Sequence, residues 1–167
     1  PGSLEELWRL RACHPAAVLV AGATDLGLQV TKRHIHYDKV IGLEALPELK
    51  QLERRVGGWW IGAGVNLTRL MDTVGPEIKG LDKMMRVFGS RQIRSRATLG
   101  GNLCNASPIG DNPPMMIALG ATAVIAGSGG TRRIPMEDFF VGYRQTALTG
   151  DEILLAVELP HLASEAY

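Results

Sequence analysis

Residues 100–111 constrain the fold most, because this segment is dense in glycine and in hydrogen-bonding side chains and almost uncharged. The residues concerned are Gly100, Gly101, Asn102, Asn105, Ser107, Gly110 and Asp111. Consecutive glycines are poorly tolerated in regular elements, so residues 100–102 predict an interruption of helix or strand. Loops longer than about 12 residues are usually functional or disordered, and Leu99, Leu103 and Ile109 argue against disorder. We interpret the segment as one that wraps a polar cofactor; a long irregular surface loop is the alternative.

A second segment, residues 18–27, joins an apolar run to a turn of small residues. Residues 18–21 predict a buried strand, residues 22–25 a tight turn, and residues 26–32 a helix. Unpaired backbone N–H groups at such a helix start suit a phosphate, and Thr24 adds a hydroxyl donor. The alternative is an ordinary strand-to-helix turn with Thr24 or Asp25 as the cap, which the segment alone favours. The segment matches neither a Walker loop nor a Gly-x-Gly-x-x-Gly motif.

The remaining pattern predicts an α+β chain with two lobes. Helices are predicted at residues 3–12, 68–74, 78–87 and 111–119, and strands at 39–41, 49–53, 59–61, 121–126, 131–135 and 153–159. The first helix begins with a capping box of Ser3 and Glu6, and the strands at 49–53 and 59–61 predict a hairpin. Residues 137–143 are short and mixed. The character of the sequence changes near Gly57, which predicts lobes at residues 1–56 and 57–167.

Composition excludes several classes of protein. Lys and Arg number 18 against 17 Asp and Glu, which disfavours nucleic-acid binding. The densest basic stretch, residues 86–96, predicts a solvated turn with some capacity for phosphate. No apolar run reaches the ~18 residues of a membrane helix. Two cysteines, Cys13 and Cys104, are too few for a cluster and suit a reducing cytoplasm. The start at Pro1, without Met, predicts an excerpt of a longer polypeptide.

No set of side chains is arranged for catalysis or metal binding. The pair His34 and His36 could bind a metal, but an exposed strand edge is favoured because no third ligand is near in sequence. Cys104 could be a reactive thiol, but a small apolar filler is favoured. We therefore predict no catalytic residue and no metal ligand, and expect a cofactor to supply the chemistry.

Together, residues 19–25 and 98–111 closely resemble the flavoprotein part of the molybdenum hydroxylase family, which includes xanthine dehydrogenases and carbon monoxide dehydrogenase medium subunits. Residues 142–144 and 151–154 resemble later segments of that family in the same order. The resemblance implies a two-lobe FAD-binding domain of the vanillyl-alcohol-oxidase or PCMH-like type. A small α/β N-terminal lobe would precede a larger, mixed, mainly antiparallel α+β lobe, and the family's further C-terminal domain would be absent from this chain.

The resemblance also assigns roles toward FAD. The strand and turn would hold the pyrophosphate through backbone amides at Val18, Leu19, Val20, Ala21, Gly22, Ala23, Thr24, Asp25 and Leu26. Phe88 would lie near the isoalloxazine ring, and Leu154 would pack against the flavin or adenine end. The diphosphate and ribityl chain would bind Thr98, Gly101, Asn102, Asn105 and Ser107, and Asp111 would bind a ribose or ribityl hydroxyl.

The implied partners are an iron–sulfur domain and a molybdenum-binding subunit as electron source, with NAD or another acceptor as electron sink. The implied function is electron transfer, and the alternative is a cofactor-free docking module that assembles such a complex. The density of glycine and amide in residues 100–111 argues against that module. A covalently attached flavin would need a suitably placed His or Cys, which residues 19–25 lack.

Overall fold

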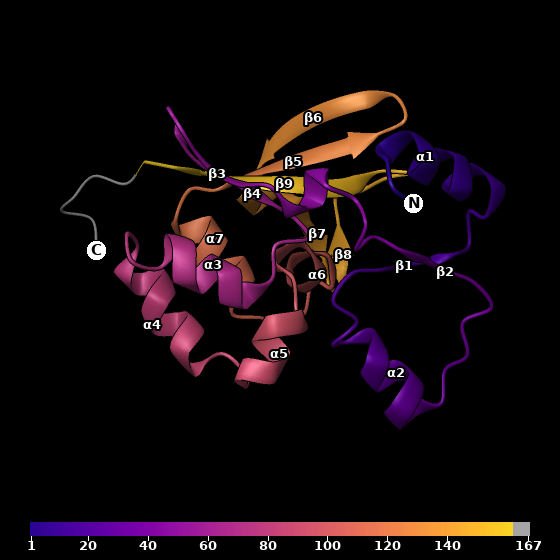
Figure 1. Ribbon diagram of the computed structural model, residues 1–167, viewed down its shortest axis with the longest axis horizontal. Coiled ribbons are helices and arrows are strands. Elements are labelled where there is room, and N and C mark those ends of the chain that lie inside the picture. The colour runs from indigo at the N-terminus through magenta and orange to yellow at the C-terminus, as the bar shows by residue number, and fades with distance from the viewer. Residues whose placement is uncertain (162–167) are drawn as a thin grey trace.

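The structure is a computed structural model that describes residues 1–161, and its centre is a five-stranded antiparallel sheet (Figure 1). The strand order is β3 (Leu52–Arg55), β4 (Gly58–Gly62), β9 (Ile153–Pro160), β5 (Thr122–Gly127) and β6 (Gly130–Pro135). The hairpins β3–β4 and β5–β6 flank β9, which pairs antiparallel with both β4 and β5. The last strand in sequence is therefore the middle of the sheet.

Helices cover one face of this sheet (Figure 1). They are α3 (Leu67–Val74), α4 (Lys79–Val87), α5 (Arg91–Arg96), α6 (Leu99–Cys104) and α7 (Asn112–Ala118). Apolar side chains from both layers, such as Ile61, Val157, Leu70, Met85 and Leu103, form one buried cluster. Burying these side chains is the main stabilising contribution to the fold.

The opposite face of the sheet has a smaller apolar cluster. Trp60, Val124 and Ala156 are buried there, and the guanidinium of Arg55 lies 4.0 Å from the centre of the Trp60 ring. A long charged side chain thus covers an aromatic ring while its charge stays in water.

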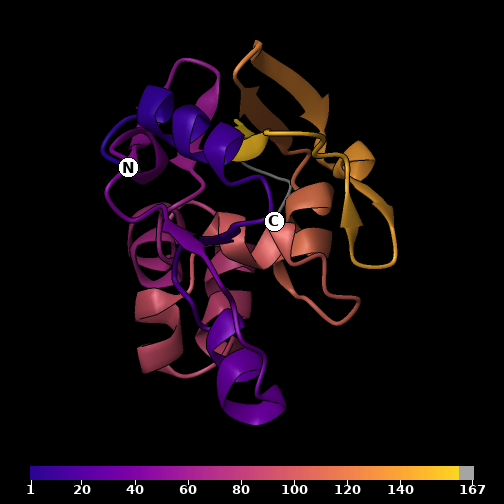
Figure 2. The ribbon, with the colours of Figure 1, turned by 90° about the vertical axis from the view of Figure 1, so that its right-hand side faces the viewer.

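The N-terminal part contains a separate, two-stranded parallel sheet and two helices. The sheet pairs β1 (Val18–Val20) with β2 (Val40–Gly42), and the helices are α1 (Leu4–Cys13) and α2 (Leu26–Arg33). The predicted cap of α1 is confirmed, because the Ser3 hydroxyl accepts a hydrogen bond from the Glu6 N–H. Figure 2 shows α2 projecting from the rest of the molecule, and none of its residues is buried.

The remaining short elements connect these parts. A 3₁₀ turn, η1 (Glu48–Lys50), leads into β3, and a second, η2 (Met136–Phe139), follows β6. The hairpin of β7 (Phe140–Gly142) and β8 (Gln145–Thr146) then leads toward β9.

The predicted α+β class with a mainly antiparallel sheet is confirmed. The lobe boundary at residues 56 and 57 stays a prediction: the β3–β4 hairpin spans it, and one apolar cluster includes Leu7 and Val157 from either side. None of the helices within residues 1–161 is long and apolar enough to cross a lipid bilayer.

Three local predictions were wrong. Residues 100–102 lie inside α6 and do not interrupt regular structure. The basic stretch contains a helix, α5, in which Arg94 donates to the carbonyls of Phe88 and Gly89, both at 2.7 Å. His34 is exposed but ends α2 in a left-handed conformation (φ 55°) instead of lying on a strand.

Candidate functional site

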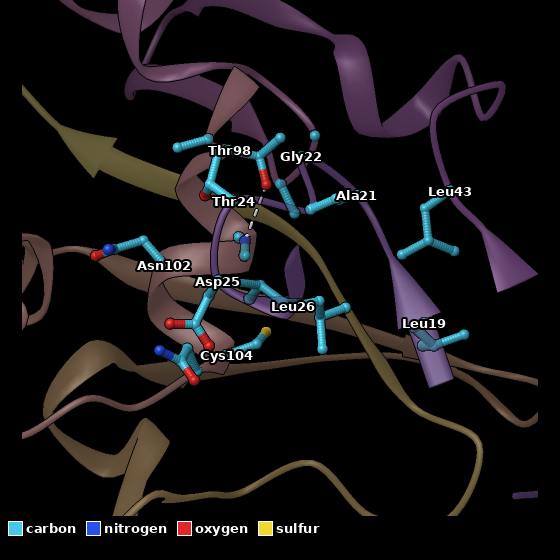
Figure 3. Close-up of a pocket in the computed structure, with 18 of the residues that line it drawn as sticks. Leu19, Ala21, Gly22, Thr24, Asp25, Leu26, Leu43, Thr98, Asn102 and Cys104 are labelled. Carbon is cyan, nitrogen blue, oxygen red and sulfur yellow. Dashed lines mark hydrogen bonds between the residues drawn. The ribbon is translucent and has the colours of Figure 1, made fainter. Parts of the chain in front are cut away.

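A cavity of about 540 Å³ lies where the N-terminal part meets the helices and the central sheet (Figure 3). Its walls come from the turn between β1 and α2, from α6, and from the start of β9. Most of its lining side chains are apolar, and the polar ones come mainly from the two segments singled out in the sequence. This volume and character are typical of a site for a small organic ligand.

The turn of the first segment packs directly against the backbone of Arg96 and Ala97, which immediately precede the second segment. A Cβ atom on Gly22 would lie 2.0 Å from the carbonyl oxygen of Arg96, so only glycine allows this contact. After Arg96, the start of α6 packs against the end of β4. The Gly100 N–H donates a hydrogen bond there to the carbonyl of Ala63, which directly follows β4, at 2.8 Å. A Cβ on Gly100 would lie 2.5 Å from the Cβ of Ala63. Glycines at both positions therefore let a turn, a helix and a strand converge on one cavity.

The turn before α2 presents free backbone amides. Ala23 has a positive φ of 61°, which is strained for a residue with a Cβ. Asp25 sits at the N-cap position, but its side chain caps nothing. The N–H groups of residues 22–26 donate to no residue within 1–161. Successive free amides at a helix start form a ready site for an anion.

The wall formed by α6 is held by its own cap and by α7. Thr98, which is only 7% exposed, accepts a hydrogen bond from the Gly101 N–H at 3.0 Å (Figure 3). Asn102, one turn further, accepts one from the buried Asn112 at 3.0 Å. Capping compensates for the two glycines, which by themselves disfavour a helix.

The start of β9 forms another part of the wall, at an irregularity in the sheet. The register between β5 and β9 shifts after Val124, and Leu155 is left out of that pairing. Its carbonyl instead accepts from the Ala63 N–H at 2.9 Å. The shift places Ile153 and Leu154 against the cavity, as bulges near binding sites often do.

Cys104 lies in the same wall, with its thiol exposed to the cavity but surrounded by protein atoms. These protein atoms exclude water from the sulfur and disfavour the charged thiolate, so burial raises the pKa of Cys104 to about 12. A thiol that stays protonated is a poor nucleophile. Cys104 therefore contributes a protonated thiol to the cavity wall.

An ionic group supports the loop that leads into β9. The Glu152 carboxylate accepts from Arg132 at 2.7 Å and from the Thr149 N–H at 2.9 Å. Arg11 of α1 donates to the carbonyls of Gly150 and Glu152. The hydrogen bond from Arg132, assisted by those from Thr149, lowers the pKa of Glu152 to about 2. This group fixes the loop that brings Leu148 and Glu152 to the cavity.

Most residues predicted for the site line this cavity: Leu19, Ala21, Gly22, Ala23, Thr24, Asp25, Leu26, Phe88, Thr98, Gly101, Asn102, Asn105 and Leu154. Val18 and Val20 do not, because alternate side chains of a strand face opposite sides and Leu19 faces the cavity. Ser107 and Asp111 lie beyond the lining, in the connection from α6 to α7. The structure therefore does not bring these four to the cavity wall.

Sequence reasoning missed part of the wall: Leu28, Leu43, Leu49, Ala63, Gly64, Ile93, Ala97, Gly100, Leu148, Glu152 and Ile153. Most of these are small or apolar residues without a local motif, and only the three-dimensional packing places them there. Gly100, Glu152 and Ile153 did stand in segments that the sequence singled out. No group of three potential metal ligands occurs within residues 1–161.

Comparison with known proteins identifies the family. Residues 1–162 match the family described as the FAD binding domain in molybdopterin dehydrogenase. The xanthine dehydrogenase of Oryza sativa subsp. japonica is 37% identical over 172 residues, which cover 96% of this chain and 13% of that protein. The chain thus spans about an eighth of the length of that relative.

Solved structures show the same fold. Quinoline 2-oxidoreductase from Pseudomonas putida 86 superposes with a TM-score of 0.89 at 32% identity, over 96% of this chain and 57% of that one. A carbon monoxide dehydrogenase from Hydrogenophaga pseudoflava gives a TM-score of 0.91 at 26% identity, over 98% of this chain and 58% of that one. With the match of the family model, these likenesses establish that the chain belongs to the FAD-binding domains of the molybdopterin dehydrogenases.

Proposed function

We propose that the cavity between the β1–α2 turn and α6 is the FAD site, and that the chain serves as an electron-transfer domain of a molybdenum hydroxylase. The observation that carries this proposal is the union of an apolar cavity with a row of unpaired backbone amides. FAD combines an apolar ring system with a doubly charged pyrophosphate, so it needs both kinds of surface.

The residues present fit this cofactor. The amides of residues 22–26, with the Thr24 hydroxyl, would hold the pyrophosphate. Thr98, Gly101, Asn102 and Asn105 would hydrogen-bond the polar chain, and Phe88 and Leu154 would contact the rings. Val18 and Val20 would contact FAD through their backbone only. The contacts of Ser107 and Asp111 with FAD remain predictions.

When bound, FAD supplies hydride and single-electron transfer, which no side chain in this cavity supplies. The protein's part is to bind and orient the cofactor and to surround it with an apolar wall. The raised pKa of Cys104 keeps the thiol protonated beside it.

The relatives suggest the partners. We propose that the electrons come from a molybdenum-binding subunit through an iron–sulfur domain, and that they leave to NAD or another acceptor. We place this activity in the cytoplasm, because two cysteines, both free, suit a reducing compartment.

The direct test is the absorbance of the purified chain in the flavin bands, followed by release and identification of the cofactor. Asn102→Ala should weaken FAD binding by about tenfold, since it removes a side chain of the cavity wall. Asp111→Ala tests separately the ribose or ribityl contact predicted for Asp111, which lies outside that wall, and should also weaken FAD binding. A colourless chain that also ignores added FAD would overturn the proposal and favour a docking module.

A further inference from the structure

The turn between α4 and α5 brings an aromatic residue to the cavity. Residues 88–90 form this turn (Figure 1), and the first of them, Phe88, lines the cavity and packs against the main apolar cluster. Gly89 follows with a positive φ of 51°, a conformation that glycine adopts without strain. Because glycine also leaves a turn free to take other conformations, the turn by itself does not fix the position of Phe88.

Arg94 of α5 holds this turn through its backbone. The Nη1 of Arg94 donates to the carbonyls of Phe88 and Gly89, both at 2.7 Å. The Phe88 N–H donates to the carbonyl of Met84 at 3.1 Å, so both backbone polar groups of Phe88 are hydrogen-bonded. Hydrogen bonds from a charged donor are about twice as strong as neutral ones. One guanidinium thus fixes two successive peptide groups beside the cavity.

Within residues 1–161, the side chain of Arg94 donates hydrogen bonds to this turn alone. It forms no ion pair with a carboxylate of the described chain and lies outside the cavity lining. Arg94 is nevertheless half-buried, with a buried Nε, whereas every other residue of α5 is exposed. The two bonds to the turn are therefore the polar contacts that keep this side chain against the protein.

We infer that Arg94 is a positioning residue that fixes the backbone of Phe88 and so holds the Phe88 side chain against the flavin. Arg94 does not touch the cofactor and acts through the two carbonyls that it binds. The inference rests on the proposed FAD site, in which Phe88 contacts the rings, and it adds a role for a residue outside the cavity wall.

The test is the dissociation constant of FAD, measured by flavin fluorescence with the full chain. Arg94→Met keeps an unbranched side chain but removes its donors, and we expect FAD binding about tenfold weaker. In Arg94→Lys the ammonium lies one bond short of Nη1 and still donates to the turn, so the loss should stay below about threefold. Arg91→Met is the matched control, because Arg91 lies on the same helix, is exposed and donates no side-chain hydrogen bond within residues 1–161. It should leave FAD affinity unchanged.

A double-variant cycle and the flavin spectrum separate positioning from a general loss of structure. Phe88→Ala should weaken FAD binding about tenfold. In that background Arg94→Met should change the affinity by less than about twofold, because no ring remains to be held. Contact with an aromatic ring alters the absorption of the isoalloxazine. In chains saturated with FAD, Phe88→Ala and Arg94→Met should therefore shift the long-wavelength flavin band in the same direction, and Arg91→Met should not shift it.

The possible outcomes are distinct. If Arg94→Met does not fold, Arg94→Gln takes its place in the cycle, because the glutamine nitrogen extends only as far as Nε and not to Nη1. An affinity within about twofold of the unaltered chain, a loss that adds to that of Phe88→Ala, or an unchanged flavin band would overturn the inference while the FAD site stands. An unaltered chain that does not bind FAD would overturn the proposed function and this inference with it.

Discussion

Gly22 shows how a single residue brings the two halves of the site together. Its missing side chain lets the β1–α2 turn rest on the backbone of Arg96 and Ala97. Gly22→Ala would place a methyl group 2.0 Å from the Arg96 carbonyl, and backbone atoms cannot rotate away as a side chain would. We expect a loss of about 1–3 kcal/mol in the free energy of unfolding, measured by urea denaturation, together with weaker FAD binding.

Gly27→Ala is the matched control, because Gly27 is already helical and no atom beyond its chain neighbours and its own helix backbone lies within 4 Å of the place that a Cβ would take. Alanine there should stabilise the chain by about 0.5–1 kcal/mol, since glycine loses more backbone entropy on folding. If Gly22→Ala and Gly27→Ala changed the free energy of unfolding equally, the close packing of Gly22 on the Arg96 carbonyl would be refuted.

The same kind of contact explains a wrong prediction. Two consecutive glycines predicted a break at residues 100–102, yet Gly100 is required inside α6 because Ala63 approaches it so closely. Local propensity is a weak preference that tertiary packing overrides. The sequence pattern located the residues that mattered, but it could not show which neighbour required the glycine.

At the scale of elements, the loop between β8 and β9 depends on one ionised group. The Glu152 carboxylate binds Arg132 and Thr149, and only 17% of its side chain is exposed. Because the folded-state pKa is about 2, below its ordinary 4.5, the unfolded chain takes up the proton first as the pH falls. The stabilisation is thus complete above about pH 4.5 and is lost as the pH falls toward 2.

Glu152→Gln should lower the free energy of unfolding at pH 7 by about 1–2 kcal/mol, a value reduced by the solvent exposure of Arg132. The difference from the unaltered chain should narrow as urea titrations are repeated down to about pH 3. Glu53→Gln breaks a pair that is about half exposed, Glu53 with Arg55, and should cost less than about 0.5 kcal/mol at either pH. A constant difference across that pH range would contradict the account of Glu152.

The prediction of helices and strands succeeded where turn and cap residues mark the ends of an element, and failed for short elements without an apolar face. The hairpin β3–β4 and the helix α7 with its early prolines were found, because turn and cap residues mark their ends. The helix α5 was missed: its six residues are mostly polar, and it is fixed by Ser90 as cap and by Arg94 bonded to the preceding turn. Such a short helix has no apolar face for a sequence pattern to reveal.

At the scale of the whole molecule, the order of the strands could not be predicted from the sequence. β9 lies between β4 and β5, which are far from it along the chain, and this pairing forms the cavity wall at Leu154. Wall residues such as Leu43, Leu49 and Leu148 belong to no sequence motif, and only the packing of the whole chain brings them to the cavity. What the sequence did provide was the pair of glycine-containing segments, and the fold brings both to the wall of one cavity.

The central claim is that these two segments, far apart in sequence, form one site for one cofactor. Hydrogen–deuterium exchange of the chain with and without FAD tests this directly, with riboflavin as the control that lacks the pyrophosphate. We predict that FAD slows exchange at residues 22–26 and at residues 98–105 together, with the same concentration dependence, and that riboflavin does not protect residues 22–26. Slower exchange in only one of the two segments would contradict the account. So would half-maximal protection of the two segments at different FAD concentrations.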